Sequence, residues 1–122
     1  MTDTTAPLDV ARAYFDAWTT RDLDRAMSFV APDVVVDAPA GRIEGADAFR
    51  AFMGPFTQIL KRANMISAFG DDTTALIMYD TETVPVPSAP AAECLTVRDG
   101  LITHDRFIFD RAPFDAARRE SG

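Results

Sequence analysis

The sequence has few of the residues that disulfides and zinc sites need. Its 122 residues include one cysteine, Cys94, and one histidine, His104. A single cysteine cannot form an intramolecular disulfide, and one Cys with one His cannot complete a zinc site. The sequence also has no Gly-rich phosphate-binding loop, which would indicate a nucleotide cofactor. The sequence therefore predicts a cytoplasmic protein without a metal or another cofactor.

Positive charge and long apolar runs are also scarce. Lys and Arg number 12 against 19 Asp and Glu, for a net charge of −7. This balance argues against binding to a nucleic-acid backbone or to an acidic membrane surface. No apolar run approaches the roughly 18 residues of a membrane-spanning helix, and the polar start MTDTTAPLD does not resemble a signal peptide. We expect neither a nucleic-acid partner nor a membrane partner.

Apolar side chains are abundant, at 48% of the chain, and they include nine Phe and five Met. This length and composition suit one soluble globular domain with its own core. The Phe and Met side chains would fill that core or line an apolar pocket. We predict a single domain over residues 1–122, with flexible ends at residues 1–6 and 115–122.

Helical patterns come first along the chain. The run PLDVARAYFDAWTTRD predicts a helix of roughly 13 residues that begins at Pro7. Asp22 is suited to cap a second helix over LDRAMSFVA. A short strand over residues 33–37 and a turn-rich hairpin around Gly41 follow. A third helix begins near residue 45 or 46, and Gly54-Pro55 predicts a kink or a break in it.

Strand patterns dominate after residue 62. The runs NMISAF, TTALIMYDTETV, AAECLTVR and LITHDRFIFD are rich in β-branched and aromatic residues, and GDD and RDG are tight-turn signals. Helices followed by such a meander predict an α+β fold with helices on one face of a curved sheet. In the second run, Met78, Asp80 and Glu82 share one face and Ile77, Tyr79 and Thr81 share the other. The sequence does not decide which of these faces is inside.

Four stretches resemble, in their order and spacing, the SnoaL-like and ketosteroid-isomerase-like branch of the nuclear transport factor superfamily. They are YFDAWTTRDLDRAMSFVAPDV, GRIEGADAFRAFM, AAECLTVRDGLI and HDRFIFD, within residues 8–114. The resemblance implies a cone-shaped, curved antiparallel (mixed) sheet that is covered by three N-terminal helices and encloses a pocket. It also implies a homodimer through the convex face of the sheet.

The isomerases of this branch imply three catalytic positions. Tyr14 stands where they keep a hydrogen-bonding tyrosine, and Glu93 stands where they keep a protonated aspartate. Their general base falls at Ala38, and the acid here is Asp37, one residue earlier. One step along a strand changes the face. Asp37 would therefore act only if the backbone turns before Pro39, and we rank it below Glu93.

The cyclases and epoxide hydrolases of the branch imply an acid on the last strand, where this chain has Phe107. Asp105 lies two residues earlier, on the same face as Phe107 and Phe109. If those rings face the pocket, Asp105 also does, as a base or a polar anchor. His104 would then face the convex side, towards solvent or a dimer partner.

Glu93 can also be interpreted without the resemblance, because it alternates with Leu95 and Val97 along its strand. Burial among aliphatic side chains would favour its neutral form. The alternative is a surface ion pair with Arg98 or Arg106. Cys94 points to the opposite face from Glu93, and we interpret it as structural.

Two functions remain open. The first is a small cofactor-independent enzyme that acts on an apolar, ring-bearing molecule by acid/base chemistry, as an isomerase, cyclase, dehydratase or epoxide hydrolase. The second is a non-catalytic module for small-molecule binding or dimerisation, which Ala38 and Phe107 favour because they replace acids. In either case, the predicted ligand-binding residues are Trp18, Phe49, Phe52, Phe56, Met78, Asp80, Phe107 and Phe109.

Overall fold

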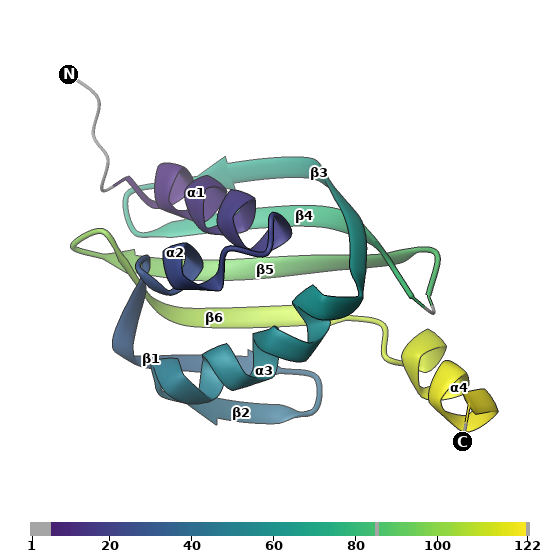
Figure 1. Cartoon of the computed structure of the whole chain (residues 1–122). Helices are drawn as coiled ribbons and strands as arrows, with labels where there is room; N and C mark the ends of the chain where they lie inside the picture. Colours follow the sequence, from purple (N-terminus) through teal and green to yellow (C-terminus); the bar gives the residue numbers. More distant parts are fainter. Residues whose placement is uncertain (1–5, 85, 122) are drawn as a thin grey trace.

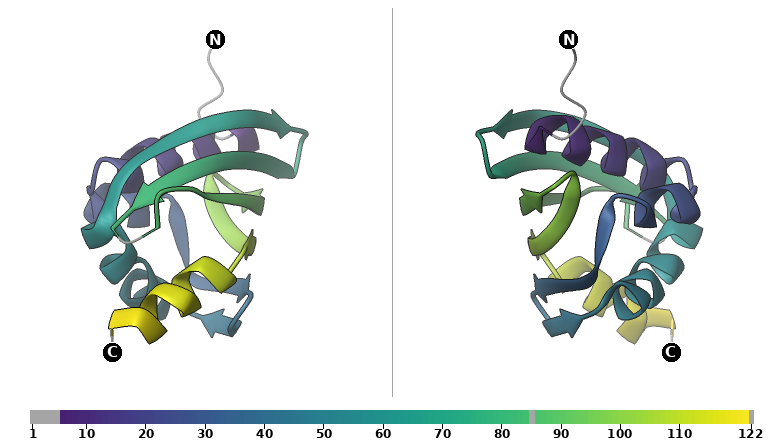
Figure 2. Two further views of the ribbon diagram at one scale, coloured as in Figure 1. Left: turned by 90° about the vertical axis from the view of Figure 1, so that its right-hand side faces the viewer. Right: turned by 90° about the vertical axis from the view of Figure 1, so that its left-hand side faces the viewer.

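Three N-terminal helices lie inside the curve of a twisted sheet in the computed structural model, which describes residues 6–84 and 86–121 (Figures 1 and 2). These helices are α1 (Pro7–Thr19), α2 (Leu23–Met27) and α3 (Ala46–Ile59). A further helix, α4 (Ala112–Ser121), follows the last strand and lies apart from the other three (Figure 1).

The sheet has six strands in the order β2-β1-β6-β5-β4-β3 and does not close into a barrel. Only the β1–β6 pair is parallel. The chain forms β2, α3, β3, β4 and β5 after β1, and β6 then pairs with β1 in the same direction. The predicted α+β class with a curved mixed sheet is confirmed. The strands are β1 (Val30–Ala38), β2 (Gly41–Glu44), β3 (Leu60–Gly70), β4 (Thr74–Thr83), β5 (Ala89–Arg98) and β6 (Leu101–Phe109).

Local signals explain most helix ends. Pro7 occupies the first turn of α1, and the Asp22 side chain accepts a hydrogen bond from the Arg25 amide at 3.1 Å, so it caps α2 as predicted. The second helix is shorter than predicted because the chain has already entered β1 at Val30. Of the kink or break predicted at Gly54-Pro55, the break is wrong: α3 continues through the proline to Ile59, and side chains on both sides of the proline pack against the core.

The C-terminal helix α4 was not predicted from the sequence, which indicated flexibility over residues 115–122. Figure 2 shows α4 below the open end of the curved sheet. Of the N-terminal segment that was also predicted to be flexible, residues 1–5 lie outside the described residues.

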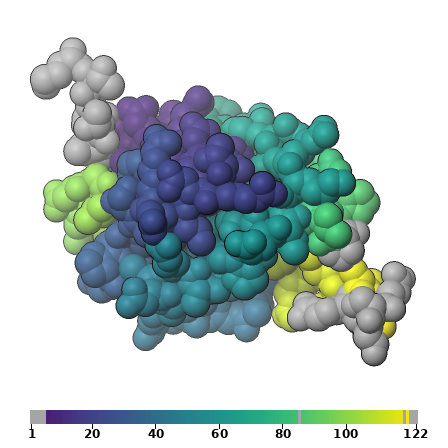
Figure 3. Space-filling view, viewed as in Figure 1, coloured from purple at the N-terminus to yellow at the C-terminus, as the bar shows by residue number. Residues whose placement is uncertain are grey.

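The core fills the space between α1, α3 and the inner face of the sheet. Tyr14, Phe15 and Trp18 of α1 are buried there, together with Phe49 of α3 and Tyr79 of β4. The indole of Trp18 and the ring of Tyr79 meet edge to face, with centroids 5.5 Å apart. In the space-filling view, α1, α2 and α3 form a continuous surface over this core, with α4 at its edge (Figure 3).

Candidate functional site

Two carboxyl groups meet on the inner face of the sheet. On β6, Asp105 pairs directly with Leu95 of β5, so Glu93 is its diagonal neighbour on the same face. The exposed fractions of Glu93 and Asp105 are 2% and 0%. The structure thus places both acids inside the fold, as the alternation predicted. A surface ion pair of Glu93 with Arg106 is ruled out, since Arg106 is exposed on the other face.

The pKa shifts of these acids indicate that they share a proton. Two ionised carboxylates can only accept hydrogen bonds, and neither oxygen of Asp105 has a hydrogen-bond donor among the described groups. Burial raises the pKa of Asp105 well above its usual range, and the charge of Glu93 raises it further. Burial also raises the pKa of Glu93, while hydrogen bonds from Asp105 and Tyr79 oppose that rise. Burial therefore favours the neutral form of Asp105, and a neutral Asp105 could donate its proton in a hydrogen bond to the Glu93 carboxylate.

Two tyrosines complete this group. The Tyr79 hydroxyl donates a hydrogen bond to Glu93 Oε2 at 2.7 Å. The Tyr14 hydroxyl is buried without a partner in the described structure. Burial, and then the negative charge of Glu93, raises the pKa of both phenols, so both stay protonated at neutral pH. We call Tyr14, Tyr79, Glu93 and Asp105 the acid cluster. A pair of carboxyl groups that holds one proton can both donate a proton and accept one.

Asp37 lies outside the acid cluster, on the outer face of the sheet. Its carboxylate is 2.8 Å from His104 Nε2, 3.2 Å from Arg42 Nε and 3.8 Å from Arg106 Nη2. Hydrogen bonds from His104 and then Arg42 lower the pKa of Asp37. The strand continues regularly through Ala38, so the backbone does not turn inward before Pro39. The structure thus contradicts the predicted catalytic position of Asp37, and it places His104 on the outer face as predicted.

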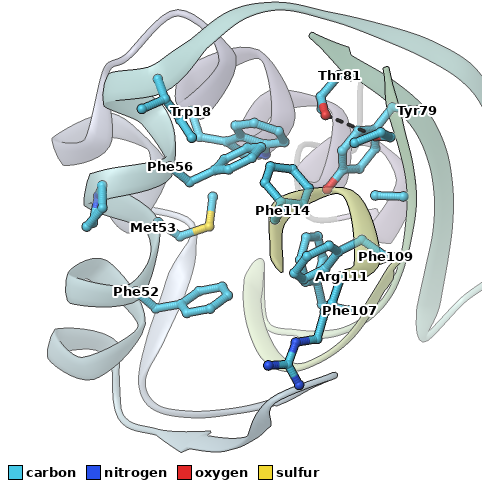
Figure 4. A pocket seen from close by; sticks show the side chains of 14 residues that line it. Trp18, Phe52, Met53, Phe56, Tyr79, Thr81, Phe107, Phe109, Arg111 and Phe114 are labelled. Atoms are coloured by element: carbon cyan, nitrogen blue, oxygen red, sulfur yellow. Dashed lines mark hydrogen bonds between the residues drawn. The ribbon is translucent and has the colours of Figure 1, made fainter. Parts of the chain in front are cut away.

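A cavity of about 340 Å³ lies beside the acid cluster, between α3, α4 and the inner face of the sheet (Figure 4). Aromatic and aliphatic side chains form nearly all of its wall. Tyr79 belongs both to this wall and to the acid cluster, whereas Tyr14, Glu93 and Asp105 do not line the cavity. The lining residues are Trp18, Phe52, Met53, Pro55, Phe56, Ile59, Tyr79, Thr81, Ala89, Ala91, Phe107, Phe109, Arg111 and Phe114.

Five predicted ligand-binding residues line this cavity: Trp18, Phe52, Phe56, Phe107 and Phe109.

The other three predicted binding residues do not line the cavity. Phe49 packs in the core, with its ring stacked 6.2 Å from that of Tyr14. Met78 and Asp80 are on the outer face of β4, because the alternation of this strand turns Tyr79 inward. Met78 is 45% exposed.

Several lining residues were not predicted to bind a ligand, and the polar ones among them matter most. Tyr79 and Thr81 lie on the same, inner face of β4. They could have been predicted as lining residues only if the sequence had shown which face of this strand is buried. Arg111 and Phe114 lie just before the segment that was predicted to be flexible from residue 115. Only the isolated Phe114, beside an otherwise polar stretch, hinted that this part of the chain packs against the domain.

No group of three or more His, Cys, Asp and Glu side chains that could hold a metal ion occurs within residues 6–84 and 86–121. In the same part of the chain, no helix has the length and apolar character required to cross a bilayer.

Comparison with known proteins places the fold in a large group of solved structures. The model of the SnoaL-like domain matches residues 11–105. A crystal structure of a protein from Kribbella flavida DSM 17836 is 66% identical, covers 97% of this chain and 99% of its own, and superposes with a TM-score of 0.93. The search of curated proteins found no match.

Two more distant structures share the fold. A candidate polyketide cyclase from Sinorhizobium meliloti is 22% identical, with a TM-score of 0.74 over 88% of this chain and 100% of that one. A candidate ketosteroid isomerase from Kribbella flavida DSM 17836 is 21% identical, with a TM-score of 0.73 over 89% of this chain and 79% of that one.

Proposed function

The chain belongs to the SnoaL-like domain family, and from this premise we propose that it is a cofactor-independent enzyme that exchanges a proton with an apolar, ring-bearing molecule. The aromatic cavity supports the ligand class, because flat rings pack well against aromatic walls. The names of two neighbours, a candidate polyketide cyclase and a candidate ketosteroid isomerase, agree with this chemistry. Proton transfer beside a carbonyl requires only a base and a group that stabilises the resulting oxyanion.

The position of Tyr79 carries the proposal. Its ring forms part of the cavity wall, and its hydroxyl donates to Glu93 at 2.7 Å. A proton taken from a bound ligand would reach the Tyr79 oxygen while the hydroxyl proton of Tyr79 moves to the Glu93 carboxylate. The ligand is left as an enolate and Glu93 as a neutral acid. The reverse transfer returns the proton to another carbon of the ligand and completes an isomerisation.

Asp105 and Tyr14 would set the proton affinity of this relay. The proton that Asp105 donates to Glu93 stabilises the Glu93 carboxylate, and this keeps Glu93 available as an acceptor despite its burial. The buried Tyr14 hydroxyl has no partner in the described structure. It is a free donor close to the charge of the two acids.

Non-catalytic binding is the second candidate, and one observation favours it. Glu93 and Asp105 are buried behind Tyr79 and do not line the cavity, and Tyr79 itself is only 1% exposed. A ligand would reach the Tyr79 hydroxyl only if neighbouring side chains in the wall moved. In a binding protein, the acid cluster would be a structural feature of the core.

Deuterium exchange separates the two candidates. A panel of bicyclic ketones is incubated with the protein in heavy water, and NMR follows the loss of the proton beside the carbonyl. The enzyme proposal predicts exchange faster than in buffer, and a loss of roughly 100-fold or more in Glu93→Gln. If the ketones bind but exchange at the buffer rate, the protein is a binder.

We also propose that two copies associate through the outer face of the sheet. Cross-strand neighbours Met78, Ala92 and Ile108 form an apolar row there, and Phe69 and Leu76 form another. Four of these side chains are large and exposed, which is typical of an interface rather than of a solvated face. We further propose that the protein has no nucleic-acid partner and no membrane partner, and its net charge of −7 supports this. Its single cysteine supports a cytoplasmic location.

A further inference from the structure

Among the residues that the structure describes, the inner part of the cavity exposes no unengaged polar group to a ligand. The Thr81 hydroxyl donates to the Ala89 carbonyl at 3.0 Å (Figure 4), and the Tyr79 hydroxyl donates to Glu93. The Trp18 Nε1 atom has no hydrogen-bond partner among the described groups, but it is fully buried and so is not presented at the cavity surface. A charged ligand group would lose its hydration there without gaining a partner. Such a group must therefore lie at the edge of the cavity.

Arg111 is the charged side chain in the cavity wall. It is exposed, and its guanidinium forms no ion pair with the side chains that the structure describes. The preceding acid, Asp110, is engaged elsewhere, because its Oδ1 accepts a hydrogen bond from the Ala112 amide at 2.9 Å. The chain has a net charge of −7, so a cation beside an apolar cavity, without an ion pair to the described side chains, would attract an anionic ligand group.

Helix α4 sets the position of this cation. The Asp115 amide donates to the Arg111 carbonyl at 2.9 Å, so Arg111 occupies the N-cap position, directly before the first residue of the helix. Phe114 is three residues later, and both side chains line the cavity. Its ring packs edge to face on Phe109, with centroids 5.8 Å apart. Figure 4 shows Phe114 among the aromatic rings and Arg111 extending past Phe107, on the side of the cavity away from Trp18.

We propose that the ligand is a ring-bearing acid, with its apolar rings in the cavity and a carboxylate, sulfonate or similar anionic group held by Arg111. The planar guanidinium suits such groups because it can donate two parallel hydrogen bonds to their oxygens. This inference rests on the binding step of the proposed function and narrows its ligand class. It does not depend on whether proton transfer follows.

Two fluorescent probes test the inference because they share one ring system and differ in charge. Anilinonaphthalene sulfonate carries an anionic group, and phenylnaphthylamine is its neutral counterpart. Each is titrated against wild type, Arg111→Gln and the control Arg12→Gln. Arg12 is exposed on α1 and does not line the cavity, so its replacement makes the same change in net charge.

The inference predicts that Arg111→Gln weakens binding of the sulfonate probe roughly three- to tenfold, as expected for a partly solvated charged hydrogen bond. Binding of the neutral probe stays unchanged, and Arg12→Gln affects neither probe. The difference also shrinks at high salt. Equal weakening of both probes by Arg111→Gln, or no weakening of either, overturns the inference.

A third variant locates the probes. Ala91 faces the cavity from β5, so Ala91→Phe fills part of it; circular dichroism and a thermal melt verify that the variant is folded. Weaker binding of both probes supports binding in the cavity. If Ala91→Phe leaves both affinities unchanged, the binding step of the proposed function fails, and the inference fails with it. If only the Arg111 result is negative, the proposed function survives.

Discussion

Replacing Asp105 with asparagine tests the shared proton of the acid cluster. Burial and the charge of Glu93 raise the pKa of Asp105 well above its ordinary value of 3.8. Between that value and the raised one, the folded protein keeps a proton on Asp105 that the unfolded chain has lost. The folded state binds more protons in this range, so the free energy of unfolding must fall as pH rises.

The expected magnitude follows from the number of protons. A difference of one proton between the folded and unfolded states corresponds to a slope of about 1.4 kcal/mol per pH unit. The asparagine side chain has no titratable proton to lose, and its amide can still donate a hydrogen bond to Glu93. The Asp105→Asn variant should therefore lose this part of the slope, so its stability relative to wild type rises with pH.

Urea unfolding measured from about pH 4 to about pH 9 gives the two stability curves. Asp71→Asn is a control of opposite sign. Hydrogen bonds from the Thr73 and Thr74 amides lower the pKa of Asp71, so its stabilisation is present above 3.8 and disappears only in more acidic solution. The control should therefore leave the slope above about pH 5 unchanged. Parallel curves for wild type and Asp105→Asn would refute the shared proton.

Two further predictions concern packing and assembly. A Cβ at Gly70 would lie 2.9 Å from Leu8 Cβ, so Gly70→Ala should lower the free energy of unfolding by about 1–3 kcal/mol in urea. Met78→Glu should shift the proposed dimer to monomer in analytical ultracentrifugation without loss of fold, and an unchanged sedimentation coefficient would contradict the proposed interface.

Patterns with one buried face could be predicted from the sequence. In β6, the alternation of Asp105 with Phe107 and Phe109 predicted that the Asp105 side chain faces inward. In β5, the alternation of Glu93 with Leu95 predicted the same for Glu93. The structure agrees on both because each strand has one clearly apolar face. The fold class could also be predicted, because helical patterns come first and are followed by a meander with tight-turn signals between neighbouring strands.

Other features depended on contacts between distant parts of the chain. Both faces of β4 carry apolar side chains, because Leu76 and Met78 are exposed on the outer face. Alternation alone could not reveal that Tyr79 faces inward.

Helix α4 was missed for a similar reason. Its polar sequence predicts no core face, and it meets the domain through Phe114, which packs on Phe109. Residues such as Arg111 can be assigned to the cavity only when this tertiary contact is known.

The most direct test of the proposed function compares wild type with Tyr79→Phe in the deuterium-exchange assay. Phenylalanine keeps the ring in the cavity wall and removes the hydroxyl that connects the cavity to Glu93. We predict that the affinity for the neutral probe is unchanged and that ketone exchange slows by roughly 100-fold or more. Exchange at the wild-type rate in Tyr79→Phe would contradict the proton relay.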